Sequence, residues 1–406
     1  MIANVPAGAL AGLKVIDLSR VLGGPFCTQW LGDHGADVIK IEPPQGDETR
    51  HWGPPFDDNG ASSYFLGVNR SKRGISIDLR EEAGRAVLMR LLEDADFLIE
   101  NFKTGTLAKW GIDYDPVLRD RFPRLIHCRI TGFGADGPLG GFPGYDAVVQ
   151  AMAGWLSVNG SAESGPTRLG IPMVDIGTGL SAAFGLLAAL YEREKSGIGQ
   201  FLEVSLYDTA LSLLFPHAAN WFLTGKRPGL PGNQHPNVVP YDTFTTMTCD
   251  IFIGVGNDGQ FARLADTLGK PALAADERFT TNGARNIHRS ELKAELETLL
   301  ASRNGEEICN ALMNKGVPAG PVLGVPEVVT HPHTLHREMV VEIGNYRGIS
   351  NPVKLARTPP RPSKAPPRFG EDTRDVLMEA GLKTDEIKTL IDSGIVSALS
   401  EEPAET

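Results

Sequence analysis

Short apolar runs alternate with amphipathic segments over the first two hundred residues of the chain. The apolar runs have the length and the β-branched content of buried strands, and the segments between them repeat apolar positions at helical spacing. Strands are predicted at residues 13–18, 37–41, 75–79, 97–99, 124–130 and 201–204, and helices at 27–33, 81–92, 180–193 and 207–223. This alternation predicts an α/β fold with a mostly parallel sheet that carries helices on both faces.

The pattern changes after residue 224. Residues 226–240 are rich in Pro and Gly and indicate a linker or a binding loop. Strands at 244–255 and helices at 260–268, 291–300 and 306–315 then predict a smaller α+β domain. A further linker leads to a strand at 339–343, an extended Pro-dense stretch at 358–367, and two short helices at 373–380 and 384–392.

Composition narrows the class of protein. A chain of 406 residues suits two lobes, or one large domain with an insertion. Thirty-nine basic and fifty acidic residues give a formal charge of −11, which argues against a nucleic-acid partner, so an anionic ligand needs a local basic pocket. The four cysteines (Cys27, Cys128, Cys249 and Cys309) lie far apart and indicate reduced thiols without a cysteine-based zinc site. With no secretory signal and no apolar run of about 18 residues, we predict a cytoplasmic protein without a membrane partner.

Asp175 lies between glycines in the segment 170–179, just ahead of the helix predicted at 180–193. The glycines let a ligand approach the backbone closely, and a helix start offers unpaired N–H groups and a positive dipole end. A carboxylate held there is expected to stay ionised and to serve as a nucleophile toward an activated acyl group. The alternative is that Asp175 is only a helix N-cap, and spacing leaves both interpretations open.

Two loops carry residues suited to an anionic ligand. Residues 69–74 place three cations in four positions before a strand, which suits phosphate but equally suits a solvated turn. Residues 101–105 follow a strand at the ligand-binding edge of such a sheet, where Phe102 either flanks a ligand or belongs to the core.

Three other motifs predict less. The glycines of 132–138 lack the GxGxxG spacing of a dinucleotide loop, and Asp146 in the segment 144–146 opens a predicted helix as a plausible N-cap. His331, His333 and His336 form an HxHxxH cluster, but Pro332 interrupts any helix there and no acidic or cysteine partner is nearby. We therefore predict no metal site.

In chain order, a set of segments resembles the class III coenzyme A transferases of the CaiB/BaiF type. The segments are LAGLKVIDLSRVLGGPF, ETRHWGPPF, NRSKRGISIDL, ENF, TGFGADGP, GYDAVVQ, VDIGTG, GQFLEVSLYD, GNDGQF, GVPAGPV and APPRFGEDT. The resemblance implies a Rossmann-like large domain built from residues 1–224 and 331–406, a small domain at 225–330, and an interlocked homodimer.

The resemblance also implies the chemistry. Asp175 matches the family's nucleophile, which carries CoA as an aspartyl-CoA thioester between an acyl-CoA donor and a carboxylic acid acceptor, so CoA is a substrate and no bound cofactor is needed. The substrate or oxyanion residues implied are Tyr145, Gly232, Asn233 and His235, and the CoA contacts implied are Lys72, Arg73, Asn101, Phe102 and Lys109. Some relatives carry Arg where this chain has Pro43, which departs from the family's pattern.

Within the family, the segments are most similar to transferases that use succinyl-CoA with glutarate or hydroxymethylglutarate. An α-methylacyl-CoA racemase is an alternative, but it carries His where this chain has Tyr145, and a phenol with a pKa of about 10 is a poor base. Formyl-CoA:oxalate transferases carry Gln where this chain has Leu22. A CoA-binding protein without turnover is the further alternative. The distal carboxylate of a diacid needs a cation, and the candidates are Arg20, Arg50, Arg168 and His235.

Overall fold

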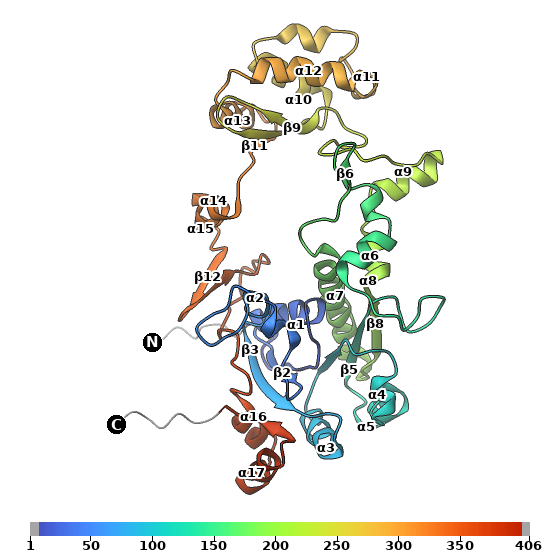
Figure 1. Cartoon of the computed structure of the whole chain (residues 1–406), viewed down its shortest axis with the longest axis vertical. Helices are drawn as coiled ribbons and strands as arrows, with labels where there is room; N and C mark the ends of the chain where they lie inside the picture. Colours follow the sequence, from blue (N-terminus) through green and yellow to red (C-terminus); the bar gives the residue numbers. More distant parts are fainter. Residues whose placement is uncertain (1–7, 400–406) are drawn as a thin grey trace. The chain divides into compact units, whose positions relative to one another are not determined.

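The computed structural model describes residues 8–399, and their contacts divide into two compact units (Figure 1). Of the described residues, the large unit contains 8–153, Gly170–Leu213 and 332–399, and the small unit contains Gly154–Leu169 and Leu214–His331. Two segments that the sequence placed in the large domain, 154–169 and 214–224, therefore belong to the small unit, as does His331.

The large unit is built on a seven-stranded sheet within the described residues. In spatial order its strands are β14 (Val396–Ser397), β3 (Lys72–Ile77), β2 (Asp37–Glu42), β1 (Lys14–Asp17), β4 (Phe97–Glu100), β5 (Ile126–Thr131) and β8 (Phe201–Ser205). Neighbouring strands pair in parallel, except that β14 runs antiparallel to β3. The predicted α/β fold class with a mainly parallel sheet is confirmed.

The strand order reverses beside β1. From β1 the chain adds β2 and then β3 on one side, whereas β4, β5 and β8 follow on the other. The loops that leave β1 and β4 therefore diverge, and such a switch point is where open parallel sheets bind ligands. This topology predicts a ligand-binding site between the two loops.

Two layers of helices cover the sheet. Ile16, Ile39 and Ile75 share one core cluster with residues of α3 (Glu82–Leu91), α16 (Thr373–Glu379) and α17 (Thr384–Asp392). On β1 and β2, the paired Asp17 and Lys40 alternate with these isoleucines and so face the opposite side. The remaining elements of this unit are α1 (Gly23–Asp33), η1 (Glu48–His51), α2 (Ser63–Gly67), α4 (Thr106–Lys109), η2 (Tyr114–Leu118), α5 (Arg119–Arg121), α6 (Asp146–Met152), α7 (Met173–Ser196), α8 (Leu206–Ser212), α15 (Pro332–His336), β12 (Val340–Ile343) and β13 (Tyr346–Ile349).

Helix α7 is the central helix of this unit. It packs on α1, α8, β5 and β8. A Cβ at Gly179 would lie 2.6 Å from the carbonyl oxygen of Gly23, so only glycine permits this approach of α7 to α1. Among the described helices α7 alone has the length and hydropathy of a membrane span, and one of its faces packs on the sheet and on α1.

The small unit has its own core. Its three-stranded antiparallel sheet has the order β11 (Ala319–Pro321), β10 (Asp250–Gly254), β9 (Tyr241–Thr245), and Ile251, Phe261 and Leu296 are among its buried residues. The other elements are η3 (Trp155–Ser157), β6 (Gly160–Ser161), β7 (Gly165–Pro166), α9 (His217–Thr224), α10 (Asp258–Thr267), η4 (Pro271–Ala275), α11 (Asn282–Ile287), α12 (Arg289–Leu300), α13 (Gly305–Asn314) and α14 (Val325–Thr330).

One predicted helix is interrupted. Residues 207–223 form two helices, α8 and α9, instead of the single one expected. Pro216 lies between them and has no N–H group to donate, which ends a helical hydrogen-bond ladder.

Candidate active site

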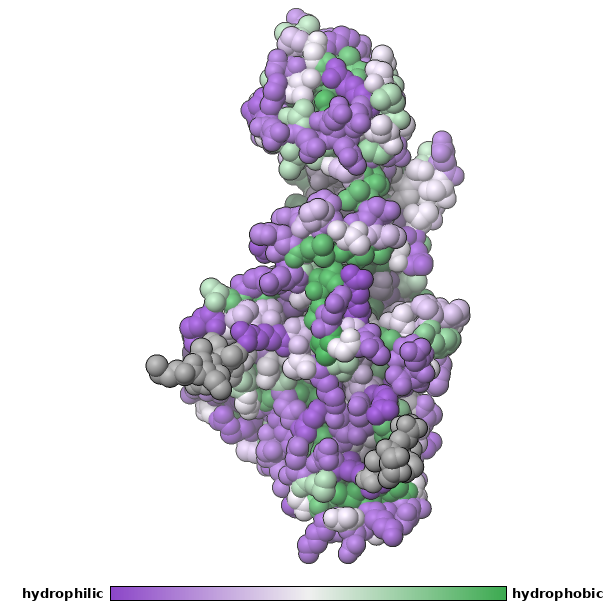
Figure 2. Space-filling view, turned by 90° about the vertical axis from the view of Figure 1, so that its left-hand side faces the viewer, coloured by the Kyte–Doolittle hydropathy of each residue, from purple (hydrophilic) through white to green (hydrophobic). Residues whose placement is uncertain are grey.

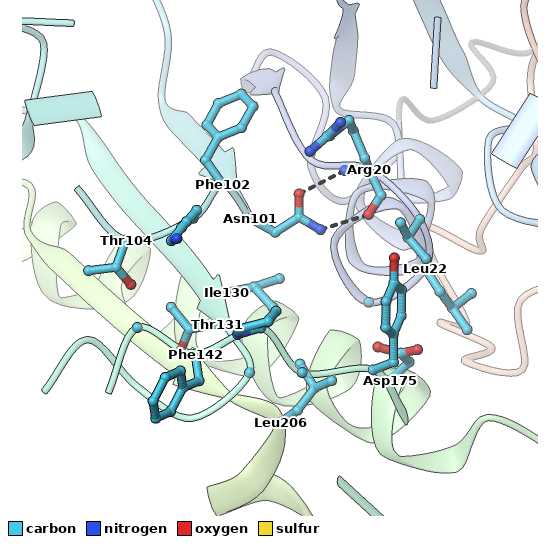
Figure 3. A pocket seen from close by; sticks show the side chains of 18 of the residues that line it. Arg20, Leu22, Asn101, Phe102, Thr104, Ile130, Thr131, Phe142, Asp175 and Leu206 are labelled. Carbon is cyan, nitrogen blue, oxygen red and sulfur yellow. Dashed lines mark hydrogen bonds between the residues drawn. The ribbon is translucent and has the colours of Figure 1, made fainter. Parts of the chain in front are cut away.

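A cavity of about 290 Å³ opens at the switch point of the large unit (Figure 3). The loops after β1, β4 and β5 form most of its wall, and the first turn of α7 contributes Asp175. Its lining includes Arg20, Val21, Leu22, Gly23, Glu48, Asn101, Phe102, Lys103, Thr104, Ile130, Thr131, Phe142, Tyr145, Asp175 and Leu206. In the view of Figure 3, Asp175 and Leu22 lie on one side of the cavity and Thr104 and Phe142 on the other.

Asp175 lies inside the first turn of α7 rather than ahead of the helix. The sequence predicted a helix start at residue 180, and it assigned the glycines around Asp175 to the close approach of a ligand. The structure shows that these glycines serve helix packing: Cβ atoms at Gly177 and Gly179 would collide with Leu213 and with Gly23. Small residues therefore mark a close helix crossing here.

Asp146 caps α7 from outside that helix. Its Oδ2 accepts hydrogen bonds from the N–H groups of Val174 at 2.8 Å and Asp175 at 3.1 Å, and its Oδ1 accepts one from Nε2 of Gln150 at 2.5 Å. The sequence predicted that Asp146 would cap its own helix. It does begin α6, but its carboxylate instead satisfies the unpaired N–H groups of α7.

The pKa of Asp175 is raised to about 7, first by burial and then by the negative charge of Asp146. The expectation that the helix start would keep this carboxylate fully ionised is therefore wrong. Because Asp146 already occupies the N–H groups at the helix start, Asp175 gains a neighbouring negative charge there. Both protonation states are populated near neutral pH.

Tyr64 lies near both carboxylates, and the sequence gave no reason to single it out. Burial, and then the charges of Asp175 and Asp146, raise its pKa to about 12. Its phenol therefore stays protonated at neutral pH, and its ring packs edge-on against Trp52 with 5.2 Å between the ring centroids.

The loop after β1 is held tightly and carries backbone strain. The side chain of Asn101 accepts a hydrogen bond from Arg20 N at 2.9 Å and donates one to Arg20 O at 2.7 Å (Figure 3). The next residue, Val21, has a φ of 71°, a left-handed conformation that a β-branched residue rarely adopts. Such strain persists where the surroundings fix the backbone.

This loop brings the start of α1 to the nucleophile candidate. A Cβ at Gly23 would lie 3.3 Å from the carbonyl oxygen of Asp175 and 3.8 Å from its Oδ1. Within residues 8–399 the N–H groups of Leu22 and Gly23 donate to no protein acceptor, and no side chain caps α1. The N–H groups at this helix start are therefore available to a negatively charged oxygen formed near Asp175.

A second cavity of about 270 Å³ adjoins the first. Arg20, Phe102 and Lys103 line both cavities, while Pro43, Arg80 and Trp110 line only the second. The guanidinium of Arg20 pairs with no carboxylate among the described residues, its Nε is buried without a hydrogen-bond partner, and it lies 6.0 Å from the ring centroid of Phe102. An unpaired cation thus separates the two cavities.

Comparison with known proteins decides the family. The model of the family described as CoA-transferase family III matches residues 10–373. The chain belongs to CoA-transferase family III. It is 40% identical over 381 residues to the succinate–glutarate CoA-transferase of Agrobacterium fabrum, covering 91% of this chain and 95% of that one. It is also 40% identical over 353 residues to the acetyl-CoA:oxalate CoA-transferase of Acetobacter aceti, covering 86% and 90%.

Solved structures support the same family assignment. The crystal structure of a CaiB/BaiF family protein from Brucella suis superposes with a TM-score of 0.83 at 39% identity, over 92% of this chain and all of that one. The protein is thus a class III CoA-transferase, an enzyme that moves CoA between carboxylic acids.

Two of the predicted CoA contacts of this CoA-transferase have other partners. Lys72 begins β3, three residues before the predicted strand, and its buried ammonium donates to Asp17, Pro25 O and Asn69. Arg73 pairs with Asp37 at 2.5 Å and Glu379 at 2.6 Å. Neither residue lines either of the two cavities described above, and their direct contact with CoA stays a prediction. The density of cations suggested a loop that binds an anionic ligand. In the structure, Lys72 instead pairs with a buried carboxylate and Arg73 with two surface carboxylates.

The other predicted CoA contacts divide between cavity and surface. Asn101 lines the catalytic cavity, and Phe102 lines both cavities and packs edge-on against Trp110. Lys109 lies exposed at the end of α4 and lines neither cavity. Lys103, which the sequence did not single out from its loop, is the lysine that lines both.

Of the four candidates for binding a distal carboxylate, Arg20 lines the cavity with Asp175. Arg50 is nearly buried and forms two 2.7 Å hydrogen bonds with Glu42, so it already has its carboxylate. Arg168 and His235 belong to the small unit, and their approach to Asp175 stays a prediction.

The remaining substrate residues are also split between the units. Tyr145 lines the cavity with Asp175. Gly232 and Asn233 belong to the small unit, where Gly232 N donates to Gly160 O at 2.8 Å and Asn233 Nδ2 donates to Thr243 Oγ1 at 2.9 Å. In residues 8–399 no three His, Cys, Asp or Glu side chains form a group that could hold a metal ion, and the three histidines of 331–336 form no such group.

Proposed function

We propose that this class III CoA-transferase moves CoA from a succinyl-CoA-type donor to a small dicarboxylic acid through an aspartyl-CoA thioester on Asp175. The observation that carries the proposal is the position of Asp175. Its carboxylate, with a pKa of about 7, lines a cavity at the switch point beside unpaired N–H groups of α1. A carboxylate of this kind is both available to react and more basic than an ordinary aspartate.

The reaction exchanges one thioester for another. Asp175 attacks the donor's thioester carbonyl, forming a mixed anhydride and releasing the CoA thiolate. The thiolate attacks the aspartyl carbonyl of the anhydride, which forms the aspartyl-CoA thioester and releases the donor acid. The acceptor carboxylate then attacks this thioester, and the same steps in reverse give acceptor-CoA and free Asp175. In each step a lone pair of oxygen or sulfur forms the new bond to the carbonyl carbon, and the pair of the broken bond leaves with sulfur or oxygen. One thioester is thus exchanged for another at little net free-energy cost, without an oxidant or a reductant.

Each step places negative charge on a carbonyl oxygen beside Asp175. The N–H groups of Leu22 and Gly23 are suited to stabilise that charge, because they have no protein acceptor and lie at the positive end of α1. Tyr145, which lines the same cavity, can donate its hydroxyl to an acyl oxygen. We assign oxyanion stabilisation and water exclusion also to Gly232, Asn233 and His235, which belong to the small unit.

The two adjoining cavities suit the two ends of an acyl-CoA. We assign the nucleotide to the second cavity, where Phe102 and Trp110 supply aromatic surface. Arg20 and Lys103, which line both cavities, then supply positive charge where the CoA chain passes from one to the other.

A small dicarboxylate is the acceptor that the catalytic cavity favours. Leu22 gives the wall apolar surface where the formyl-CoA:oxalate transferases of the family carry an amide, and the methylenes of a longer diacid can pack there. Arg20 is the unpaired arginine in this wall. Relatives named for glutarate and mesaconate support a diacid longer than oxalate, and the relative named for oxalate is the competing case.

The racemase and the non-catalytic alternatives fit less well. A racemase needs a second base beside the aspartate, whereas this chain has Tyr145 there and Asp146 is committed to capping α7. A CoA-binding protein without turnover would not need a carboxylate with a raised pKa beside unpaired N–H groups.

We also propose that the enzyme is an interlocked homodimer. On α7 the side chains of Phe184 and Tyr191 are 76% and 67% exposed, and Leu187 lies near them at helical spacing. Figure 2 shows apolar side chains, in green, gathered in several places on one face of the described chain. Exposed aromatic surface on a central helix is typical of a subunit interface.

The test is a screen of acyl-CoA donors against small mono- and dicarboxylic acids, with acyl-CoA products identified by mass. Protein quenched with donor should gain the mass of CoA less water on the peptide that contains Asp175, and hydroxylamine should convert it to a hydroxamate. The matched Asp175→Ala protein should gain neither. Incorporation of solvent deuterium at the acyl α-carbon without any exchange of CoA would instead identify a racemase. Binding of acyl-CoA without either reaction would identify a non-catalytic protein.

A further inference from the structure

Four charged side chains lie completely buried behind the loops of the catalytic cavity. Asp17, Lys40, Asp47 and Lys72, which we call the buried charge cluster, have no side-chain exposure and line neither cavity. Two acids balance two bases. Ion pairs removed from water rarely stabilise a fold more than apolar side chains of the same size would, so stability alone is a weak reason for this arrangement.

The cluster fixes the start of the loop that carries Arg20 and Val21. Asp17 Oδ1 accepts from Ser19 N at 2.9 Å, and Lys40 Nζ donates to Ser19 O at 2.9 Å. Both backbone groups of Ser19 are therefore held, and Asn101 holds both backbone groups of Arg20. The strained φ of Val21 follows directly after these four hydrogen bonds.

The same cluster fixes the far end of that loop. Lys72 Nζ donates to Asp17 Oδ2 at 3.1 Å and to Pro25 O, in the first turn of α1, at 3.0 Å. Asp17 Oδ2 also accepts from Thr28 Oγ1 of α1 at 2.6 Å. The residues that face Asp175 thus lie between two anchors that meet on one carboxylate.

A second wall of the cavity is tied to the cluster through Asp47. Its Oδ2 accepts from Lys40 Nζ at 2.9 Å, and its Oδ1 accepts from Thr49 N at 3.0 Å, which caps η1. Glu48 of η1 lines the catalytic cavity. Thr49 O accepts from Ser62 Oγ at 2.5 Å, and Ser62 caps α2, which carries Tyr64.

We propose that the buried charge cluster is a positioning device that holds the loop of residues 19–25 and η1 at a fixed distance from Asp175. Its members are positioning residues, since none of them lines the catalytic cavity or the adjoining one. The proposal rests on Asp175 being the nucleophile. It predicts that loss of the cluster lowers the rate of chemistry more than it weakens the binding of substrate.

The experiment compares two buried ion pairs of equal burial. Lys40→Met removes the bonds to Ser19 O and Asp47 while nearly keeping side-chain length. Arg70→Met breaks the buried Arg70–Asp33 pair, which lines neither the catalytic cavity nor the adjoining one. Each variant is assayed for kcat and for the KM of the acyl-CoA donor, at equal distance below its own thermal midpoint. Amide hydrogen exchange is measured on peptides covering residues 18–26 and 47–52.

For Lys40→Met we expect kcat to fall by about 10²-fold with little change in KM, because a displacement of about 1 Å has that effect on a reacting geometry. Exchange in both peptides should become faster, and Arg70→Met should alter neither kcat nor these peptides. Equal losses of kcat in the two variants, or unchanged exchange in Lys40→Met, would overturn the proposal. If Lys40→Met does not fold, Asp47→Asn, which keeps an oxygen for Thr49 N, takes its place in the experiment. The same results in kcat and in hydrogen exchange then support or overturn the proposal. A wild-type protein without CoA exchange refutes the proposed function instead, while the peptides still report the positioning.

Discussion

Asp17 and Asp175 lie beside the same helix, α1, but their electrostatic surroundings shift their pKa values in opposite directions. Burial alone would raise the pKa of Asp17, but the charges of Lys72 and Lys40 and hydrogen bonds from Ser19 and Thr28 lower it below its usual value. Burial raises the pKa of Asp175 as well, and there the next influence is another carboxylate, Asp146. The scaffold aspartate receives cations and hydroxyl donors, whereas no cation or hydroxyl donor among residues 8–399 reaches the carboxylate of the aspartate that faces the cavity.

The difference has a chemical meaning. A carboxylate surrounded by donors is a stable anchor and a poor nucleophile, because its lone pairs are already engaged. A carboxylate with a raised pKa holds its electrons less tightly and gains more on forming a bond to carbon. The arrangement thus separates structural charge from reactive charge along one helix, α1.

Replacing Asp175 by Ala gives the largest expected effect and tests the reactive half of this comparison. CoA exchange should fall by at least about 10³-fold, because the covalent route is lost and only binding remains. Acyl-CoA affinity, measured by calorimetry, should stay nearly unchanged. Asp17→Asn is the matched change in the scaffold, and it should lower the thermal midpoint. Exchange at the wild-type rate in Asp175→Ala would remove the proposed nucleophile.

Replacing Asp146 by Asn tests the electrostatic part of the comparison. Wild-type kcat/KM should rise with pH and level off above about 7, as Asp175 ionises. An asparagine oxygen can still accept from Val174 N and Asp175 N, but the negative charge is gone, so the acid limb of the profile should move to lower pH by about one unit. The amide of Gln150 must rotate to keep its own bond to this position. An acid limb that stays in place would show that burial alone sets the pKa of Asp175.

Arg20→Met asks which anion the unpaired guanidinium binds. Loss of a charged hydrogen bond worth about 1.5–3 kcal/mol should raise the KM of a dicarboxylate acceptor by about 10–100-fold. The KM of a monocarboxylate of similar length is the internal control and should change little. A rise in the KM of every acyl-CoA donor, with acceptors unaffected, would assign Arg20 to CoA instead.

The same comparison explains what the sequence could and could not predict. Strand positions and the nucleophile candidate follow from apolar runs and from a carboxylate among glycines, which are local patterns. The partners of charged residues are not local: Lys72 and Arg73 resemble a phosphate loop, yet their carboxylates come from residues 36 to 306 positions away. Asp17 and Lys40, two charges within otherwise apolar strands, were the available signal for a buried polar cluster. Tyr64 and the capping of α7 by Asp146 depend on tertiary contacts and left no such signal.

The smallest expected effect is a change in the free energy of unfolding. Its sign should differ between substitutions at Asp175 and at Asp17. The pKa of Asp175 is about 7 in the folded protein and about 3.9 in an unfolded chain, so between these values the folded state holds a proton that the unfolded state has released. Stability contributed by this residue therefore falls as pH rises through that window and stays low above about pH 7.

Asp175→Asn removes this penalty. The variant should be more stable than wild type by on the order of 1–2 kcal/mol at about pH 8, after allowance for the partial exposure of the carboxylate, and by less at about pH 5. Thermal midpoints of both proteins at the two pH values measure this. Asp17→Asn should do the reverse, because its folded pKa is lowered and its ionised form stabilises the fold. If both variants shift the midpoint in the same direction at about pH 8, the assignment of one aspartate to the scaffold and the other to the chemistry does not hold.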